Sequence, residues 1–99
     1  MNKEASGIDE PVPKFPFGQI VATPNVINRI PHDDFLAGLH RHLSGDWGAL
    51  DKEDWAANES ALCNGGRLFS AYLSGTDEKF WIITEADRSV TTILLPEDY

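Results

Sequence analysis

The stretch RLFSAYLSGTDEKFWIITEADRSVTTILLP, residues 67–96, decides the fold predicted for this chain. It holds three runs rich in aromatic, aliphatic and β-branched residues, separated by the turn-forming tetrads SGTD and ADRS. Within each run the side chains alternate with a period of two, which is typical of a strand. Because the connections are short, neighbouring strands are expected to pair antiparallel. The stretch therefore predicts a three-stranded antiparallel meander.

Neither face of this meander is polar. The middle run contains FWII, residues 80–83, and four consecutive apolar residues indicate a strand covered on both faces. We therefore expect one face, bearing Trp81, Ile83 and, if the register allows, Ile93, to contact another molecule. Trp47 is a further binding candidate, because large rigid aromatic side chains concentrate at protein interfaces.

The residues before the meander predict an edge strand and two or three helices. QIVA, residues 19–22, is a short β-branched run that suits an edge strand, and the Thr-Pro pair after it favours the start of a short helix. Residues 33–43 begin with two aspartates and carry apolar side chains at helical spacing. Residues 51–63 predict a third, thinly apolar helix. The fold class is α+β, with these helices packed on the meander.

Length and composition indicate a single folded domain. The chain has 99 residues and 41% hydrophobic content, which suits one modest core. Residues 1–14 are polar and aperiodic and are expected to form a flexible tail, with the domain spanning residues 15–99. We expect a cytoplasmic protein without membrane association, because no apolar run could span a bilayer and the only cysteine, Cys63, fits a reducing compartment.

The charge balance disfavours nucleic acid as a partner. The formal net charge is −8, and the eight basic residues form no continuous stripe that could bind a phosphate backbone. An acidic surface usually serves solubility. One weaker alternative is an acidic inhibitor that mimics nucleic acid and blocks a host defence enzyme.

No metal or cofactor site is expected. His40 and His42 are two positions apart on the predicted helix, so their side chains point about 200° from one another and cannot chelate one ion. The interpretation favoured here places His40 at the edge of the apolar helix face and His42 in water. Gly65 and Gly66 follow a helix rather than a strand, which does not suit a phosphate-binding loop.

One enzymatic alternative is a metal-independent ribonuclease. Its candidate residues are Arg67 as phosphate ligand and His40 or Tyr72 as general acid or base. Further polar residues of the predicted sheet could support such a site: Ser70, Thr84, Arg88 and Thr92. Helices followed by an antiparallel sheet is also the layout of barnase-like and RelE-like ribonucleases, which is an architectural analogy alone.

Four motifs together resemble a family of short uncharacterised bacterial proteins. They are FGQIVATP (17–24), SGDWG (44–48), NGGRLFSAY (64–72) and WIITEADRSVTTILLPEDY (81–99). Such proteins are often encoded on plasmids and integrated elements, and some carry a restriction-modification methyltransferase label. That label conflicts with this chain, which is short, antiparallel and without a glycine-rich cofactor loop. The resemblance implies a bacterial cytoplasmic protein with a link to mobile elements, and it carries over no catalytic residues.

The function expected from the sequence is therefore non-enzymatic. We expect a protein-interaction module or a homo-oligomer that acts through one face of the meander, because a single amphipathic helix cannot cover both faces.

Overall fold

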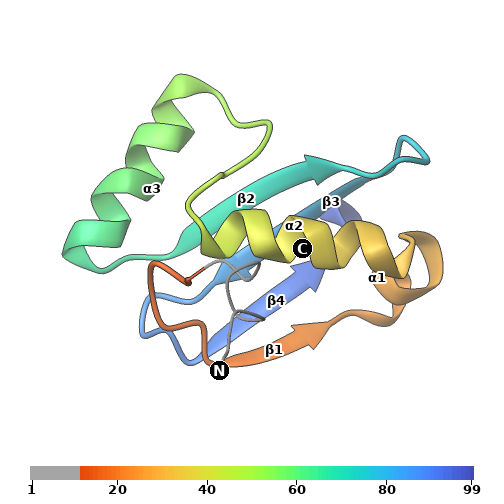
Figure 1. Cartoon of the computed structure of the whole chain (residues 1–99), viewed down its shortest axis with the longest axis horizontal. Helices are drawn as coiled ribbons and strands as arrows, with labels where there is room; N and C mark the ends of the chain where they lie inside the picture. The colour runs from red at the N-terminus through yellow and green to blue at the C-terminus, as the bar shows by residue number, and fades with distance from the viewer. Residues whose placement is uncertain (1–11) are drawn as a thin grey trace, which may run out of the picture.

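The computed structural model describes residues 12–99, so residues 1–11 of the predicted tail lie outside the described residues. The elements follow in the order β1 (Gln19–Ala22), α1 (Pro24–Arg29), α2 (His32–Leu43), α3 (Lys52–Asn64), β2 (Leu68–Leu73), β3 (Lys79–Thr84), β4 (Val90–Leu94) and a 3₁₀ helix, Pro96–Asp98. The predicted α+β class is confirmed (Figure 1). Each predicted helix and strand is present.

The sheet differs from the predicted meander. It has four strands in the order β1-β4-β3-β2, and β1 runs parallel to β4. The prediction of a three-stranded antiparallel sheet was incomplete, because the sequence does not show which strand β1 pairs with. Gly18 permits this pairing: its φ is +64°, and a Cβ there would lie 2.2 Å from the Ser89 carbonyl oxygen. Only glycine allows β1 to begin this close to β4.

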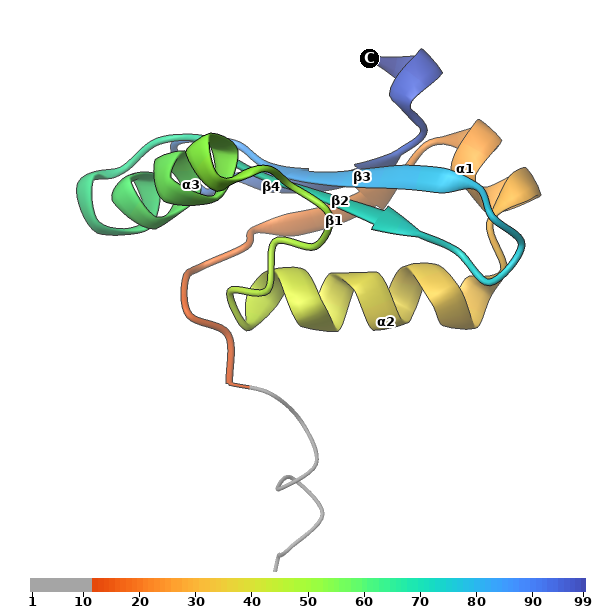
Figure 2. The same cartoon turned by 90° about the horizontal axis from the view of Figure 1, so that it is seen from above.

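Helix α2 covers one face of the sheet, here called the α2 face (Figure 2). Its inward positions are Phe35, Gly38, Leu39, His42 and Leu43. The strand residues under it are buried as well: Leu68, Ser70, Tyr72, Phe80, Ile82, Thr84, Thr91 and Ile93. The main core lies in this layer. His42 is thus buried and His40 is exposed, the reverse of the predicted placement, because the buried stripe continues from Leu39 to His42.

The opposite face of the sheet, here called the groove face, is covered in part by the chain's own C-terminal segment (Figure 2). On this face Trp81 pairs with Leu94 and Ile83 pairs with Thr92. The predicted grouping of Ile93 with Trp81 and Ile83 was wrong. Ile93 pairs with Ile82 and lies on the α2 face, because the tight turn between β3 and β4 fixes that register.

The outer edge of β2 is covered by two segments of the same chain. The Asn58 side chain of α3 bonds both the N–H and the carbonyl of Phe69, its Oδ1 accepting from Phe69 N–H at 3.1 Å. Residues 47–49 form backbone hydrogen bonds with Ala71. The Ala71 N–H donates to the Trp47 carbonyl, and the Ala49 N–H donates to the Ala71 carbonyl. Helix α3 consequently lies beside β2 (Figure 1). Strand β1 forms the other edge of the sheet.

Candidate interaction site

An apolar groove of about 360 Å³ lies on the groove face beside the β2 edge. Its apolar walls come from β2, β3 and the segment before α3: Phe69, Ala71, Leu73, Trp81, Ala49 and Leu50. Lys79 is its one charged lining residue, and Tyr72 completes the lining. A concave and mainly apolar lining of this kind suits a hydrophobic ligand.

The groove owes its shape to a row of aromatic rings. Trp81 contacts Phe69 edge to face, with ring centroids 5.0 Å apart, and contacts Tyr99 at 5.8 Å. Trp81 remains half-buried, and Leu73 at the groove's margin is 59% exposed. A partly exposed tryptophan held by neighbouring rings is pre-organised for contact, because little side-chain entropy remains to be lost.

The four predicted binding residues lie in different environments. Trp81 lines the groove, and Ile83 lies on the same face but is buried within the sheet. Ile93 is under α2, as described above. Trp47 is fully buried and its indole N–H donates to Glu59 Oε2 at 2.7 Å, so it joins the core to α3 and offers no contact surface. Sequence reasoning missed Leu73 and Leu50, whose only signal was an apolar side chain next to a turn or helix start.

The three ribonuclease candidates are not brought together. Arg67 stacks on Tyr99, with its guanidinium 5.3 Å from the ring centroid on the groove face. Tyr72 lies on the α2 face, where its hydroxyl donates to the Asp46 carbonyl at 2.6 Å and burial raises its pKa above the usual range. His40 is exposed on α2. The sheet therefore separates the predicted phosphate ligand from the predicted acid and base.

Three of the remaining polar candidates, Ser70, Thr84 and Arg88, have side-chain hydrogen-bond partners, whereas Thr92 lies on the groove face opposite Ile83. Arg88 donates to the Ala61 carbonyl at 3.1 Å and to the Gly66 carbonyl, so it caps the end of α3. Ser70 and Thr84 belong to a buried chain of hydrogen bonds centred on His42. His42 Nδ1 lies 2.6 Å from Ser70 Oγ, and Nε2 lies 2.9 Å from Thr84 Oγ1.

The far end of this chain fixes the direction of every bond in it. Thr91 Oγ1 donates to the Phe17 carbonyl at 2.7 Å, so the Thr84 hydroxyl must donate to Thr91. His42 Nε2–H then donates to Thr84, and Ser70 donates to Nδ1. Burial, together with the nearby Arg88 charge, lowers the His42 pKa from 6.5 to about 3. The imidazole is thus a neutral core residue.

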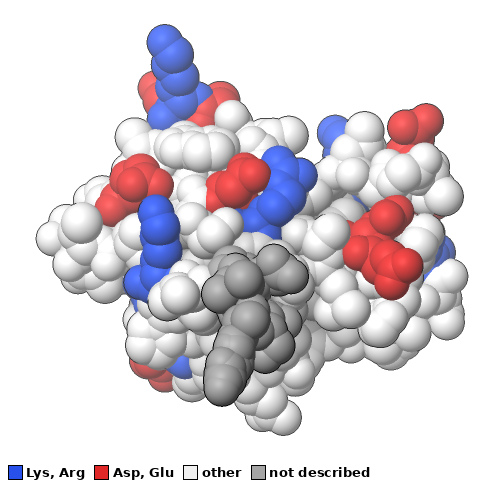
Figure 3. Space-filling model, in the orientation of Figure 1, with Lys and Arg blue, Asp and Glu red and all other residues white. Residues whose placement is uncertain are grey.

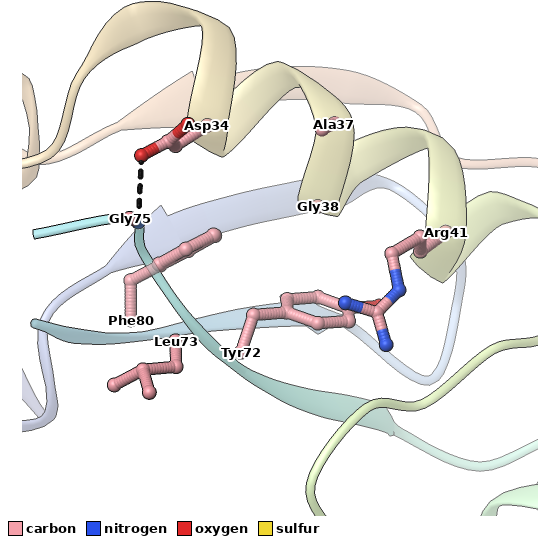
Figure 4. A pocket seen from close by; sticks show the side chains of 8 residues that line it. All are labelled: Asp34, Ala37, Gly38, Arg41, Tyr72, Leu73, Gly75 and Phe80. Atoms are coloured by element: carbon pink, nitrogen blue, oxygen red, sulfur yellow. Dashed lines mark hydrogen bonds between the residues drawn. The ribbon is translucent and has the colours of Figure 1, made fainter. Parts of the chain in front are cut away.

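A smaller pocket of about 120 Å³ lies on the α2 side of the β2 edge (Figure 4). Its charged groups already have partners. Asp34 accepts from the Gly75 N–H at 2.9 Å, and Arg41 pairs with Asp46 at 2.7 Å while lying over the Tyr72 ring. The hydrogen bond to Asp46 raises the pKa of Arg41, and the same bond lowers the pKa of the Asp46 carboxyl. In this pocket Arg41 is therefore neutralised by Asp46, and Asp34 is held by the Gly75 backbone.

Within residues 12–99, no cluster of three or more His, Cys, Asp or Glu side chains could hold a metal ion. In the same part of the chain, no helix has the length and apolar character needed to cross a membrane.

Comparisons of this chain with protein-family models, with curated proteins and with solved structures found no match. The resemblance to short bacterial proteins encoded on mobile elements therefore stays a prediction.

Proposed function

We propose that the protein is a non-enzymatic interaction module that binds an apolar segment of another protein in the groove. The observation that carries this proposal is the partly exposed Trp81, which lines the same mainly apolar groove as the exposed Leu73. Interfaces concentrate their binding energy in such central aromatic anchors.

The energetics favour a small contact over an extensive one. Fully burying a leucine side chain contributes roughly 1.5–3 kcal/mol, so Leu73 and the open part of Trp81 together support a modest, reversible affinity. Lys79 at the margin favours a carboxylate on the partner beside the apolar segment.

The setting proposed with this function is the bacterial cytoplasm, with a link to mobile elements. The four sequence motifs and the single cysteine support that setting. Neither alternative function gains comparable support. The ribonuclease candidates lie on opposite sides of the sheet, and acidic and basic side chains are interspersed on the face shown in Figure 3, unlike the continuous acidic array of a nucleic-acid mimic.

The test uses two aliphatic side chains of equal size and nearly equal exposure. Leu73 is 59% exposed in the groove, and Ile27 is 57% exposed on α1. A photo-reactive phenylalanine analogue at position 73, in cells of the native bacterium, should yield one cross-linked product of defined mass that position 27 does not yield.

A charge substitution completes the test. L73D should reduce recovery of the cross-linked partner, now captured from position 50, at least tenfold, because an unpaired carboxylate would enter the apolar groove. I27D should leave recovery unchanged. Equal products from positions 73 and 27, or no product from either, would contradict the proposal.

A further inference from the structure

The two edges of the sheet differ in how they are covered by other segments. The β2 edge is bonded by Asn58 and by residues 47–49, as described above. The β1 edge lies at the other side of the sheet, and its first three residues are exposed (Figure 1). An open edge strand presents unpaired backbone groups to any strand that approaches.

The direction of those backbone groups follows from the pairing with β4. The Gln19 N–H donates to the Ser89 carbonyl at 3.0 Å, and the Thr23 N–H donates to the Ile93 carbonyl at 3.0 Å. In a parallel ladder alternate residues bond the same neighbour, so Val21 also faces β4. The N–H and carbonyl groups of Ile20 and Ala22 are thus directed away from the sheet.

This edge also lacks the charges that normally protect an edge strand. Residues 15–28 contain no Asp, Glu, Lys or Arg, although charged residues make up 24% of the chain. Ile20 is 40% exposed and Val21 is 37% exposed. Natural edge strands are commonly blunted by lysine, proline or inward-pointing charge, and β1 has none of these within its four residues.

We propose that β1 pairs antiparallel with β1 of a second copy of this chain, so that one sheet runs through both copies. Centring the two-fold axis on Val21 places Ile20 of each copy opposite Ala22 of the other, and all the outward backbone groups are then bonded. The pairing is self-complementary, as a two-fold interface requires.

The charge distribution favours a second copy as the occupant. Two chains of net charge −8 repel one another over most of their surfaces, and the uncharged residues 15–28 lessen that repulsion along the β1 edge, beyond which the Asp98 carboxylate is bonded to Thr23 and Asn25. A basic partner would instead be attracted to the acidic surface elsewhere. The contact is short, so the dimer should be weak and concentration-dependent.

Sedimentation of the full chain from about 10 µM to about 1 mM tests this proposal, because a weak dimer populates with concentration. The wild type should shift from monomer to dimer. V21K should stay monomeric, since two ammonium groups would meet on the axis. The matched control is L36K, because Leu36 has the same 37% exposure but lies on α2, and it should dimerise like the wild type.

A cysteine variant keeps the test decisive if V21K fails to fold. In the proposed register Val21 lies opposite Val21 of the second copy in a non-hydrogen-bonded pair. The two Cα atoms are then about 4.5 Å apart, which suits a disulfide. Because Cys63 is exposed, the background is C63S. V21C should form a linked dimer under mild oxidation far faster than L36C.

Three outcomes would overturn the proposal: a wild type that stays monomeric with no preferential linkage at position 21, a dimer that V21K leaves intact, or a dimer that L73D abolishes while V21K does not. The last result would place the copies groove to groove. The groove proposal survives loss of the β1 dimer, because its cross-linking test reads a different edge of the sheet.

Discussion

At the scale of single residues, His42 shows how a polar side chain is accommodated in this core. Its two ring nitrogens are both bonded, and the directed chain Ser70, His42, Thr84, Thr91 ends on a carbonyl that can only accept. A protonated imidazole would donate from both nitrogens, and the Ser70 hydroxyl would then lose its acceptor.

The fold should therefore lose stability in mild acid. Between pH 6.5 and about 3 the unfolded chain binds a proton at His42 that the folded chain excludes. Because the unfolded state binds more protons in this window, the free energy of unfolding falls as the pH falls, by about 2 kcal/mol from this group between pH 7 and pH 5. Urea unfolding at the two pH values measures the difference.

Two histidine variants separate this effect from other titrations. H42Q should reduce the difference in the free energy of unfolding between pH 7 and pH 5, although its stability at pH 7 will also be lower. H40Q should keep the wild-type difference, because His40 is exposed. An unchanged pH dependence in H42Q would show that His42 is not the responsible group.

At the scale of elements, α3 is attached to β2 by the Asn58 side chain and packs on the core through the half-buried Trp55, Ala61 and Leu62. Asn58 is the only buried residue of this helix, which has no continuous apolar stripe. The Asn58 amide donates to and accepts from Phe69 in the way that a neighbouring strand would. Gly48 allows the adjacent segment to approach, since its φ is +79° and a Cβ there would lie 2.0 Å from the Ala71 carbonyl oxygen.

Removing the Asn58 side chain should weaken the attachment of α3 to β2. N58A leaves the N–H and carbonyl of Phe69 without partners at a partly buried edge, so we expect a loss of roughly 1–3 kcal/mol in the free energy of unfolding. Faster hydrogen exchange at the Phe69 amide should accompany it. The matched control N64A, which removes an exposed bond to Ser60, should change stability by less than about 0.5 kcal/mol.

At the scale of the whole molecule, the C-terminal segment is bonded to the start of α1. Asp98 accepts from the Thr23 hydroxyl and from the Asn25 amide, each at 2.7 Å, and from the Leu95 N–H at 3.0 Å. These bonds hold the pKa of the Asp98 carboxyl below its ordinary value. They also position Tyr99 against Trp81, and so set one end of the aromatic row.

D98A should lower the melting temperature at neutral pH and shift Trp81 emission to longer wavelength as Tyr99 leaves it. The depressed pKa contributes stability above the ordinary value of 3.8, and that contribution is lost as the pH falls below it. The difference in melting temperature between D98A and wild type should therefore shrink near pH 3. E97A removes only an exposed pair with Arg29 and should melt close to wild type.

The sequence located the elements well because their boundaries are local chemistry. Thr23 caps α1 and Asp51 caps α3. Each side chain accepts a hydrogen bond from the backbone N–H three residues later, and both caps can be recognised from adjacent residues in the sequence. The candidate site was readable only in part. Trp81 was found because it alternates with a core residue. Leu73 joins it through the pairing of β2 with β3, and Leu50 joins it only after the loop before α3 folds onto the β2 edge.

The sequence by itself determined the α+β class, the strands, the helices and the presence of a tryptophan on the second sheet face. These follow from periodicity and caps, which act over a few residues. Tertiary structure alone decided that β1 joins β4 in parallel, that Ile93 lies under α2, and that His42 rather than His40 is buried. Each of these depends on pairing or packing between distant segments, and a one-residue change of register exchanges the two faces of a strand.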